Sequence, residues 1–428
     1  MRNADRWRGS LGKREKGRKG DPCERGELEE NPGGSEKVLN ESSEGNEAMG
    51  KHLVFVGGGH AHLTALLNMG QYIQRGHRVT VIGPSAYHYY SGMGPGMLSA
   101  IYRPQEVRFH IKKLVEDRGG EFREDRVIRI DPHGRNLNLQ SGQGLPYDVV
   151  SFNTGSEVPR DLLSGETPEN LFPVKPVIHL LRAHRAIRSA LKDRKLRFVI
   201  AGGGAAGVEV AANLWRLVRD SRGEGHIILI AGRKLLGGTP DRVGKIARDS
   251  LTERGIEIIE GNRATQFRKE SITLADGKIL PYDFAFMAMG IRPSSLFDQS
   301  GLPTGKDGGL LVNVHLQSVE HPEIFGGGDC IAFAERPLLK VGVYAVRENP
   351  LLLQNLMAAL EGKAMQVFDP QKEFMLILNL GNGRGLLWRK NFVWEGRLAF
   401  LLKDYIDRKF MKKFQVSGER EEPEGEEA

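Results

Sequence analysis

The sequence predicts an α/β fold built around parallel sheets, and three observations lead to that prediction. From residue 51 onward, short apolar runs alternate with stretches of helical periodicity, as they do where helices cross between parallel strands. An apolar strand that runs into a glycine-rich turn and then a helix occurs twice, at Gly57–Gly59 and at Gly202–Gly204. The 428 residues include 54 glycines without a three-residue period, so these glycines serve turns and close approaches of the backbone.

Seven short runs are the expected strands, because each is apolar enough to be buried on both faces of a sheet. They are His52–Val56, Arg78–Ile82, Asp148–Asn153, Arg197–Ala201, His226–Ala231, Phe284–Ala288 and Glu323–Gly326. Helices are expected in several of the intervals between and after them, at 60–75, 176–193, 207–221, 242–254 and 346–361.

Composition and cysteine usage exclude several classes of protein. Hydrophobic residues make up 39% and charged residues 27%, which is typical of a globular chain and not of a fibrous or wholly disordered one. The cysteines are Cys23 and Cys330, so neither a disulfide framework nor a four-cysteine zinc site is possible. No apolar run reaches the roughly 18 residues of a transmembrane helix, and the first residues lack the apolar core of a secretory signal. We therefore expect a cytoplasmic protein, and we expect no metal site.

Both ends of the chain are expected to be disordered tails, because they lack apolar periodicity. Residues 1–20 carry eight Lys and Arg, residues 21–50 carry nine acidic residues, and residues 417–428 carry six Glu against one Arg. A basic tail can bind nucleic acid, but the acidic stretch beside it and the lack of interleaved aromatic residues argue against a nucleic-acid partner. Met49 stands just before the first strand, so a start of translation there is a further hypothesis.

The two glycine-rich turns have the spacing of a dinucleotide-binding site. In such a turn the first glycine permits a tight bend, the second lets the backbone approach a pyrophosphate, and the third lets the helix pack on the strand. Unpaired N–H groups at the helix N-terminus then face the anion. The second turn fits fully, through Gly202, Gly204 and Gly207. The first has Gly57 and Gly59 but then His62 in place of the third glycine, which predicts a wider gap between helix and strand or a local adjustment.

The acidic residue that usually binds the ribose is missing after the second strand of both units. That stretch reads Val-Ile-Gly-Pro-Ser85 in the first unit and Leu-Ile-Ala-Gly-Arg233 in the second. Arg233 favours NADPH if it contacts a 2′-phosphate, and the alternative of a solvated surface arginine stays open.

Further motifs follow in order along the chain. They are Tyr147–Gly155, Gly202–Glu209, Tyr282–Pro293, Ile324–Cys330 and Tyr344–Glu348. Together with Gly57–Gly59, they resemble the two-dinucleotide-binding-domain flavoproteins, the pyridine nucleotide-disulfide oxidoreductase superfamily. Within it, the chain looks most like type II NADH dehydrogenases and the flavoprotein domains fused to selenide, water dikinase. The resemblance covers about residues 51–415.

The resemblance implies two Rossmann-like three-layer domains, which bind FAD and NADH or NADPH, and a small C-terminal α+β domain. In this arrangement an NAD(P)-binding domain interrupts the FAD-binding domain, which then resumes before the C-terminal interface domain. The limits that it implies are a tail at 1–50, FAD-binding parts at 51–160 and 286–362, the NAD(P)-binding insertion at 161–285, the C-terminal domain at 363–416 and a tail at 417–428.

The same resemblance carries site residues onto this chain. The cofactor-binding residues that it implies are Gly57, Gly59, His60, Ser85, Tyr90, Val127, Thr154, Gly155, Gly202, Gly204, Gly207, Arg233, Gly290, Gly328, Asp329, Tyr344 and Ala345. Asp329 would bind the ribitol chain of FAD. Glu209 and Lys175 are the catalytic candidates, and they would orient the nicotinamide or relay a proton. The alternatives are a helix-N-terminal carboxylate and a solvated lysine.

The positions of the cysteines bear on the class of electron acceptor. In disulfide reductases of this superfamily a redox-active cysteine pair lies in the segment equivalent to 87–97, which contains no cysteine here. Thiol–disulfide exchange is therefore excluded there, and Cys330 is expected to be a small packed residue, which argues against sulfide oxidation. We expect direct transfer from reduced flavin to a quinone-like acceptor. The alternatives are a soluble reductase of a small electron-transfer protein and a flavoprotein module that serves selenium metabolism or redox sensing.

The segment 384–413 is basic and rich in aromatic residues, with nine Lys and Arg against three acids. Apolar residues recur there near helical spacing, which is typical of a helix that lies on a membrane surface. These residues are Leu398, Leu401, Leu402, Tyr405 and Ile406. Peripheral contact with the cytoplasmic face of a membrane is expected, unless this face docks on the protein's own core. A homodimer is also left open.

Overall fold

The structure is a computed structural model, and it describes residues 50–159, 161–163, 165, 167–371 and 373–423. These residues belong to one unit of the chain. Apart from Gly50, the tail expected at 1–50 and the hypothetical start at Met49 lie outside the described residues.

The first sheet has five parallel strands in the order β19-β9-β1-β2-β5. Its strands are β1 (His52–Val56), β2 (Arg78–Gly83), β5 (Glu121–Glu124), β9 (Val149–Phe152) and β19 (Ile324–Gly326). Every residue of the central strand β1 is buried, as expected for a parallel strand covered on both faces. Strand β19 joins the sheet from far along the chain, so the carboxyl ends of β19, β9 and β1 lie side by side.

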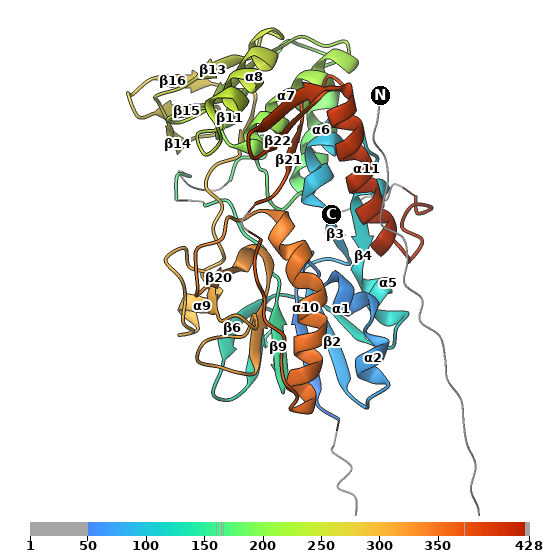
Figure 1. Ribbon diagram of the computed structural model, residues 1–428. Coiled ribbons are helices and arrows are strands. Elements are labelled where there is room, and N and C mark those ends of the chain that lie inside the picture. Colours follow the sequence, from blue (N-terminus) through green and yellow to red (C-terminus); the bar gives the residue numbers. More distant parts are fainter. Residues whose placement is uncertain (1–49, 160, 164, 166, 372, 424–428) are drawn as a thin grey trace, which may run out of the picture. The chain divides into compact units, whose positions relative to one another are not determined.

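The second sheet also has five parallel strands, in the order β10-β17-β11-β12-β13. Its strands are β10 (Leu171–Pro173), β11 (Leu196–Ala201), β12 (Gly225–Ile230), β13 (Glu257–Ile259) and β17 (Phe284–Met287). Figure 1 shows this sheet in the upper half of the ribbon and the first sheet in the lower half. The prediction of an α/β fold with parallel sheets is confirmed, whereas the exact domain limits stay a prediction.

Helices connect the strands of both sheets (Figure 1). They are α1 (Leu63–Leu67), α2 (Gly70–Ile73), α5 (Ile111–Glu116) and α10 (Gly342–Glu361) beside the first sheet, and α6 (Ile178–Ala190), α7 (Ala205–Asp220) and α8 (Asp241–Thr252) beside the second. The single helix expected at 60–75 is wrong, because the chain is irregular before Leu63 and breaks again at Asn68 and Met69.

Shorter elements complete the unit. The helical ones are α3 (Gly94–Leu98), α4 (Pro104–Val107), α9 (Leu296–Gln299) and the 3-10 turns η1 (Ser91–Met93) and η2 (Gly328–Cys330). Two pairs of strands are the antiparallel β3 (Tyr87–Tyr89) and β4 (Arg108–His110) and the parallel β18 (Leu310–Val312) and β20 (Ile331–Phe333). One antiparallel sheet consists of β6 (Val127–Asp131), β7 (Asn136–Leu139) and β8 (Gly144–Pro146), and the other of β14 (Ala264–Phe267), β15 (Ser271–Leu274) and β16 (Ile279–Pro281).

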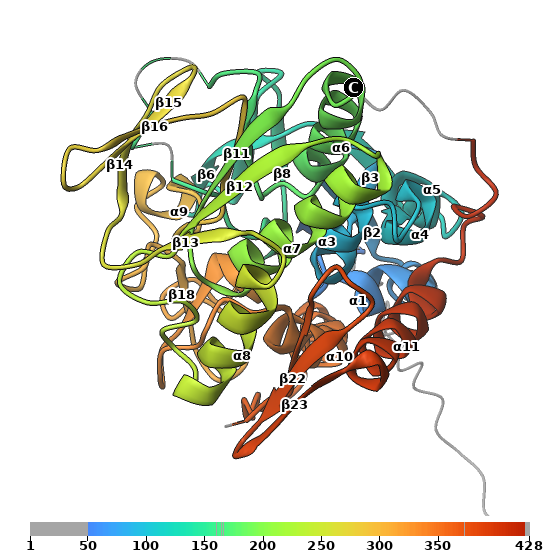
Figure 2. The ribbon, with the colours of Figure 1, turned by 90° about the horizontal axis from the view of Figure 1, so that it is seen from above.

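The C-terminal part is an antiparallel meander followed by a long helix. The meander is β21 (Leu376–Asn379), β22 (Gly385–Arg389) and β23 (Phe392–Gly396), and the helix is α11 (Arg397–Phe414). Figure 2 shows α11 lying beside β22 and β23. Among the helices of the described residues, none has both the length and the apolarity needed to cross a bilayer.

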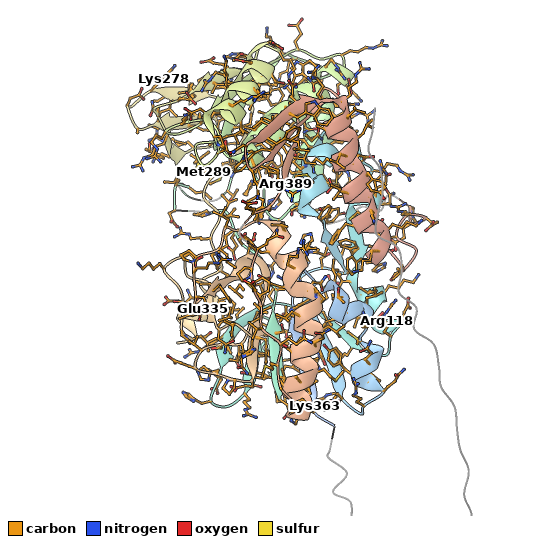
Figure 3. All side chains as sticks on the ribbon, in the orientation of Figure 1. Arg118, Lys278, Met289, Glu335, Lys363 and Arg389 are labelled. Atoms are coloured by element: carbon orange, nitrogen blue, oxygen red, sulfur yellow. The ribbon has the colours of Figure 1, made fainter. Side chains whose placement is uncertain are left out.

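Buried apolar side chains from both sheets form one continuous core. Figure 3 labels Met289, which follows β17 and packs against this core between the two sheets. The strands that lead into the two glycine-rich turns, β1 and β11, therefore pack into the same core.

The chain after α11 differs from the disordered tail expected at 417–428. Ser417 and Glu419 are buried, and Glu422 lies 2.7 Å from the guanidinium of Arg108. Hydrophobic periodicity could not indicate this, because the segment packs through carboxylates and not through apolar side chains. Residues 424–428 lie outside the described residues.

Candidate active site

The first glycine turn follows β1 and lies against the end of β9. Gly57 has a φ of +90°, which favours glycine, and a Cβ there would stand 2.4 Å from the carbonyl oxygen of Asn153. The buried side chain of Asn153 accepts from the N–H of Ala61 at 3.0 Å and donates to the carbonyl of Gly327 at 2.6 Å. This one amide joins the ends of β1, β9 and β19.

His62, which replaces the third glycine, is accommodated by a local adjustment of the backbone. Its ring is fully buried, with Nδ1 2.7 Å from the carbonyl oxygen of Gly57 and Nε2 2.8 Å from the hydroxyl of Ser151. Burial lowers the pKa of His62 to about 4, so the ring is neutral at pH 7. Helix α1 begins only after this ring, at Leu63.

Asp329 and Lys175 form an ion pair. The Nζ of Lys175 lies 2.5 Å from Oδ2 of Asp329 and 2.8 Å from the hydroxyl of Ser156, which itself donates to the same carboxylate at 2.8 Å. Burial raises the pKa of Asp329, but Lys175 and the hydrogen bonds outweigh it, so this pKa lies below its usual range. Only 24% of the Lys175 side chain is exposed, so it is not the solvated lysine of the alternative interpretation.

Glu348, a residue without a role predicted from the sequence, supports the turn that presents Asp329. Its buried carboxylate accepts from the N–H of Gly328 at 2.5 Å. Gly328 has a φ of +73°, a conformation that favours glycine. Burial raises the pKa of Glu348 to about 7, and the charge of Asp329 adds to that shift. The signal for this residue was its place four residues after Tyr344, one helical turn away.

The other residues expected near FAD lie around the ends of the first sheet. Ser85 is exposed beyond β2 and accepts from the N–H of Tyr87 at 3.2 Å. Val127 opens β6. Thr154 is exposed just beyond β9, and no atom lies within 4 Å of a Cβ built on Gly155.

The first turn of α10 also faces this region. Tyr344 and Ala345 are buried there. The N-terminal end of a long helix carries a partial positive charge, which suits the electron-rich end of a reduced flavin. With the open backbone at Gly155 and the paired carboxylate of Asp329, these residues fit FAD.

The second glycine turn follows β11 and opens α7. Gly202 has a φ of +133°, and a Cβ there would stand 2.2 Å from the carbonyl oxygen of Ala288. A Cβ on Gly207 would stand 1.7 Å from the carbonyl oxygen of Gly202, so this glycine lets the helix pack on the strand. Gly204 has no atom within 4 Å of its Cβ position. The backbone there is open to the close approach of a pyrophosphate, and the turn fits a dinucleotide.

Two further predicted residues lie exposed at the same edge of the second sheet. Arg233 follows β12, and Gly290 follows β17. Arg233 is exposed, which suits a contact with a 2′-phosphate as well as a surface arginine, and the preference for NADPH stays a prediction.

Glu209 lies on α7, close to the second glycine turn. Its partly buried carboxylate accepts from the backbone N–H of Asn379 at 2.7 Å. Burial raises the pKa of Glu209 to about 7, although the nearby charge of Lys403 acts in the opposite direction. A carboxyl group with this pKa can take up or release a proton at neutral pH.

A buried charge network on α11 was missed by sequence reasoning. The Nζ of Lys403 lies 2.7 Å from one oxygen of Asp407 and 2.8 Å from the carbonyl oxygen of Gly92, while Tyr90 donates to the other Asp407 oxygen at 2.9 Å. Lys403 and Asp407 are both buried. Burial lowers the pKa of Lys403, but Asp407 and Glu209 outweigh it and raise that pKa. The lysine-to-aspartate spacing of four residues between apolar neighbours was the available signal.

His60 and Tyr90 belong to one aromatic cluster between the two groups of charges. Their ring centroids are 5.1 Å apart, and His88 and Phe410 lie 5.3 and 5.7 Å from His60. Burial lowers the pKa of His60 to about 3 and that of His88 to about 4, so both rings are neutral. The charges of Asp329 and Lys175 also act on His60.

The structure therefore brings the two catalytic candidates into separate clusters. Lys175 pairs with Asp329 at the end of the first sheet, whereas Glu209 lies near Lys403 under α11. Tyr90 and His60 stand between these clusters.

Cys330 is the cysteine that the structure describes. Its thiol is buried and donates to the carbonyl oxygens of Phe152 and Gly327 at 3.4 and 3.3 Å. Burial raises the pKa of this thiol, which makes it a poor nucleophile. No group of three or more His, Cys, Asp or Glu side chains that could hold a metal occurs within the described residues.

A family model described as pyridine nucleotide-disulphide oxidoreductase matches residues 51–356. The chain belongs to this family. The resemblance inferred from its motifs is confirmed, and the chain is an oxidoreductase that uses FAD and NAD(P)H.

Similar proteins of known name include one NADH:quinone oxidoreductase. Ferroptosis suppressor protein 1 of Taeniopygia guttata is 26% identical over 319 residues, which cover 70% of this chain and 80% of that protein. Type II NADH:quinone oxidoreductase of Haemophilus influenzae is 23% identical over 330 residues, which cover 67% of this chain and 74% of that protein. The solved structure of NDH2 from Plasmodium falciparum in complex with NADH matches with a TM-score of 0.73 and 14% identity, over 86% of this chain and 96% of the other.

Proposed function

We propose that this protein oxidises NAD(P)H and passes two electrons to a quinone-like acceptor without a protein thiol. The observation that carries the proposal is that the cysteine-free segment 87–97 contacts charged side chains of α11, since Tyr90 donates to Asp407 and the Gly92 carbonyl accepts from Lys403. Lys403 in turn acts on the nearby carboxyl group of Glu209. The similar type II NADH:quinone oxidoreductase supports a quinone as the acceptor.

Each half of the site has a separate task in this proposal. The turn Gly202–Gly207 holds the pyrophosphate of NAD(P)H, while Asp329 and Lys175 hold the ribitol side of FAD. Bound FAD supplies the group that takes the nicotinamide hydride and returns the electrons to the acceptor.

Proton balance gives Glu209 its role. Reduction of a quinone to a quinol by NAD(P)H consumes one proton from solution per turnover. A carboxyl group whose pKa is about 7 can hold that proton and be reloaded at neutral pH. Lys403, held by Asp407 and the Gly92 carbonyl, places a fixed positive charge close enough to modulate that pKa.

Peripheral contact with a membrane is part of the proposal, because membrane quinones have apolar tails. Helix α11 exposes Leu398, Leu401 and Tyr405, which are 63%, 57% and 62% exposed. The Nζ of Lys409 on α11 lies 5.8 Å from the centre of the Tyr405 ring, so a cation borders this apolar face. An apolar face with cations around it is typical of a helix that lies on an anionic lipid surface.

A small acidic electron-transfer protein is the second candidate for the acceptor, favoured by the net charge of +7. Steady-state oxidation of NADH and NADPH, with a soluble short-chain quinone and at low and high salt, separates the two. We expect quinone-dependent turnover that changes little with salt. Turnover only with an acidic redox protein, lost steeply as salt rises, would instead support the second candidate.

A further inference from the structure

Three side chains of the antiparallel pair of strands β3 and β4 converge on one carboxylate, that of Glu422. The guanidinium of Arg108 lies 2.7 Å from its Oε2, and the hydroxyl of Tyr87 donates to the same oxygen at 3.1 Å. Nδ1 of His110 lies 2.6 Å from its Oε1. Tyr87 and His110 are cross-strand partners, and the Arg108 guanidinium lies 4.2 Å from the centre of the Tyr87 ring. The strand pair therefore forms a binding site for a carboxylate.

A second carboxylate of the same segment is bound beside the first. Glu419 is only 1% exposed, and it accepts from the backbone N–H groups of His110 and Ser417 at 3.1 and 3.0 Å. The amide of Gln415 donates to the carbonyl oxygens of Gln105 and Arg108 at 2.8 and 2.9 Å. Residues 415–423, here called the C-terminal strap, are thus attached along much of their length.

The strap continues a series of polar contacts that fasten α11 to the same part of the chain. Upstream contacts are those of Lys403 with Gly92 and of Asp407 with Tyr90. The strap adds the last attachment, beyond the end of the helix. Figure 2 shows it turning back from α11 towards α4 and α5.

Electrostatics make this attachment specific. A carboxylate loses hydration when it is buried, and only charged or hydrogen-bonding partners compensate for that loss. Glu419 and Glu422 have such partners, whereas their neighbour Glu421 is exposed. Of these three glutamates, two are bound because of where they stand in the segment, and the overall negative charge alone does not explain the attachment.

We propose that the β3–β4 strand pair is a carboxylate-binding site whose ligand is the chain's own C-terminal strap, and that this latch holds the end of α11 in place. The proposal rests on contacts within the described residues and is independent of the acceptor named under the proposed function. Since α11 also carries Lys403 and the exposed apolar face, the latch would control how firmly both are positioned.

Hydrogen exchange of the full-length, FAD-loaded protein tests the latch. Glu422→Gln removes the charge that Arg108 and His110 bind, so residues 415–423 and the last turn of α11 should exchange about tenfold faster or more. The matched control is Glu421→Gln, one residue away and exposed, which should exchange like the unaltered protein. Equal exchange in both variants would overturn the proposal.

A coupling measurement adds a second readout. Tyr87→Phe removes only the hydroxyl that donates to Glu422, so its effect on exchange should be smaller when Glu422→Gln is already present. Fully additive effects would contradict a direct contact. Neither readout needs turnover, so failure of the latch and failure of the proposed function remain distinguishable.

Discussion

At Glu209, burial beside two charged groups places the proton affinity of one carboxyl group close to neutral pH. If this group supplies the proton for acceptor reduction, kcat/KM should show an inflection near pH 7 that Glu209→Gln removes. The control is Glu348→Gln, because burial raises the pKa of Glu348 to about 7 as well. If Glu348→Gln removed the inflection and Glu209→Gln did not, Glu348 and not Glu209 would supply the proton.

The same pKa predicts the pH dependence of stability. Between about pH 4.5 and about 7 the folded protein keeps a proton on Glu209 that the unfolded chain loses, so stability contributed by this group falls as pH rises. Glu209→Gln removes that loss. The Tm of the Glu209→Gln variant minus the Tm of the unaltered protein should therefore be larger above this pH window than below it. If this difference in Tm were the same above and below the window, the raised pKa of Glu209 would be contradicted.

Two glycines of the second turn differ in the space around them, so substitutions there test nucleotide binding and folding separately. Gly204→Val has free space for its side chain, so the protein should fold and retain FAD while NAD(P)H no longer reduces it. Gly207→Ala would place its Cβ 1.7 Å from the Gly202 carbonyl oxygen and should lower the Tm by several degrees. Normal reduction of the Gly204→Val protein by NAD(P)H would exclude this turn as the nucleotide site.

Cysteine replacement tests the absence of a thiol step. Cys330→Ala combined with Cys23→Ala leaves no cysteine in the chain. Because the Cys330 thiol is buried and bonded to two carbonyl groups, turnover with a quinone should stay within about twofold. A loss of roughly a hundredfold or more, with FAD still bound, would show that a thiol takes part.

At the scale of elements, the strands of the two parallel sheets were predictable because burial on both faces requires short apolar runs. The start of α1 was not, since no pattern indicates that His62 bonds back to Gly57 and Ser151. Helix α11 was expected from its periodicity, but a buried lysine and aspartate inside it look like surface charges in a sequence.

The candidate site was predictable to a similar degree. Glycine spacing located the turns at Gly57 and Gly202, because the backbone itself forms them. The pairing of Lys175 with Asp329 and the contact of Lys403 with the Gly92 carbonyl could not be predicted, since each joins segments far apart in the chain. The strap carried no apolar signal at all.

The exposed face of α11 makes a prediction about lipid. Replacing Leu398, Leu401 and Tyr405 by Ser removes apolar area that contacts no core, so FAD content should be unchanged while sedimentation with anionic liposomes falls roughly tenfold. The matched control is Ile279→Ser, an exposed isoleucine on β16, which should leave liposome binding unchanged. Undiminished sedimentation of the triple variant would exclude this face.

For the whole molecule, two parallel sheets share one core, so the glycine turns at their ends keep a fixed relation to each other. In the proposed function, that relation would let one cofactor face the donor nucleotide and the acceptor in turn. The buried charges under α11 and the absence of a cysteine in 87–97 then favour an acceptor that receives electrons directly.

Anaerobic mixing of the FAD-loaded protein with NADH or NADPH, followed by a short-chain quinone, follows the transfer of electrons from nucleotide to flavin and from flavin to quinone. We predict that one nucleotide bleaches the flavin absorbance and that the quinone restores it, in the cysteine-free variant as well as in the unaltered protein. Bleaching that the quinone fails to reverse would exclude direct transfer from the flavin to a quinone.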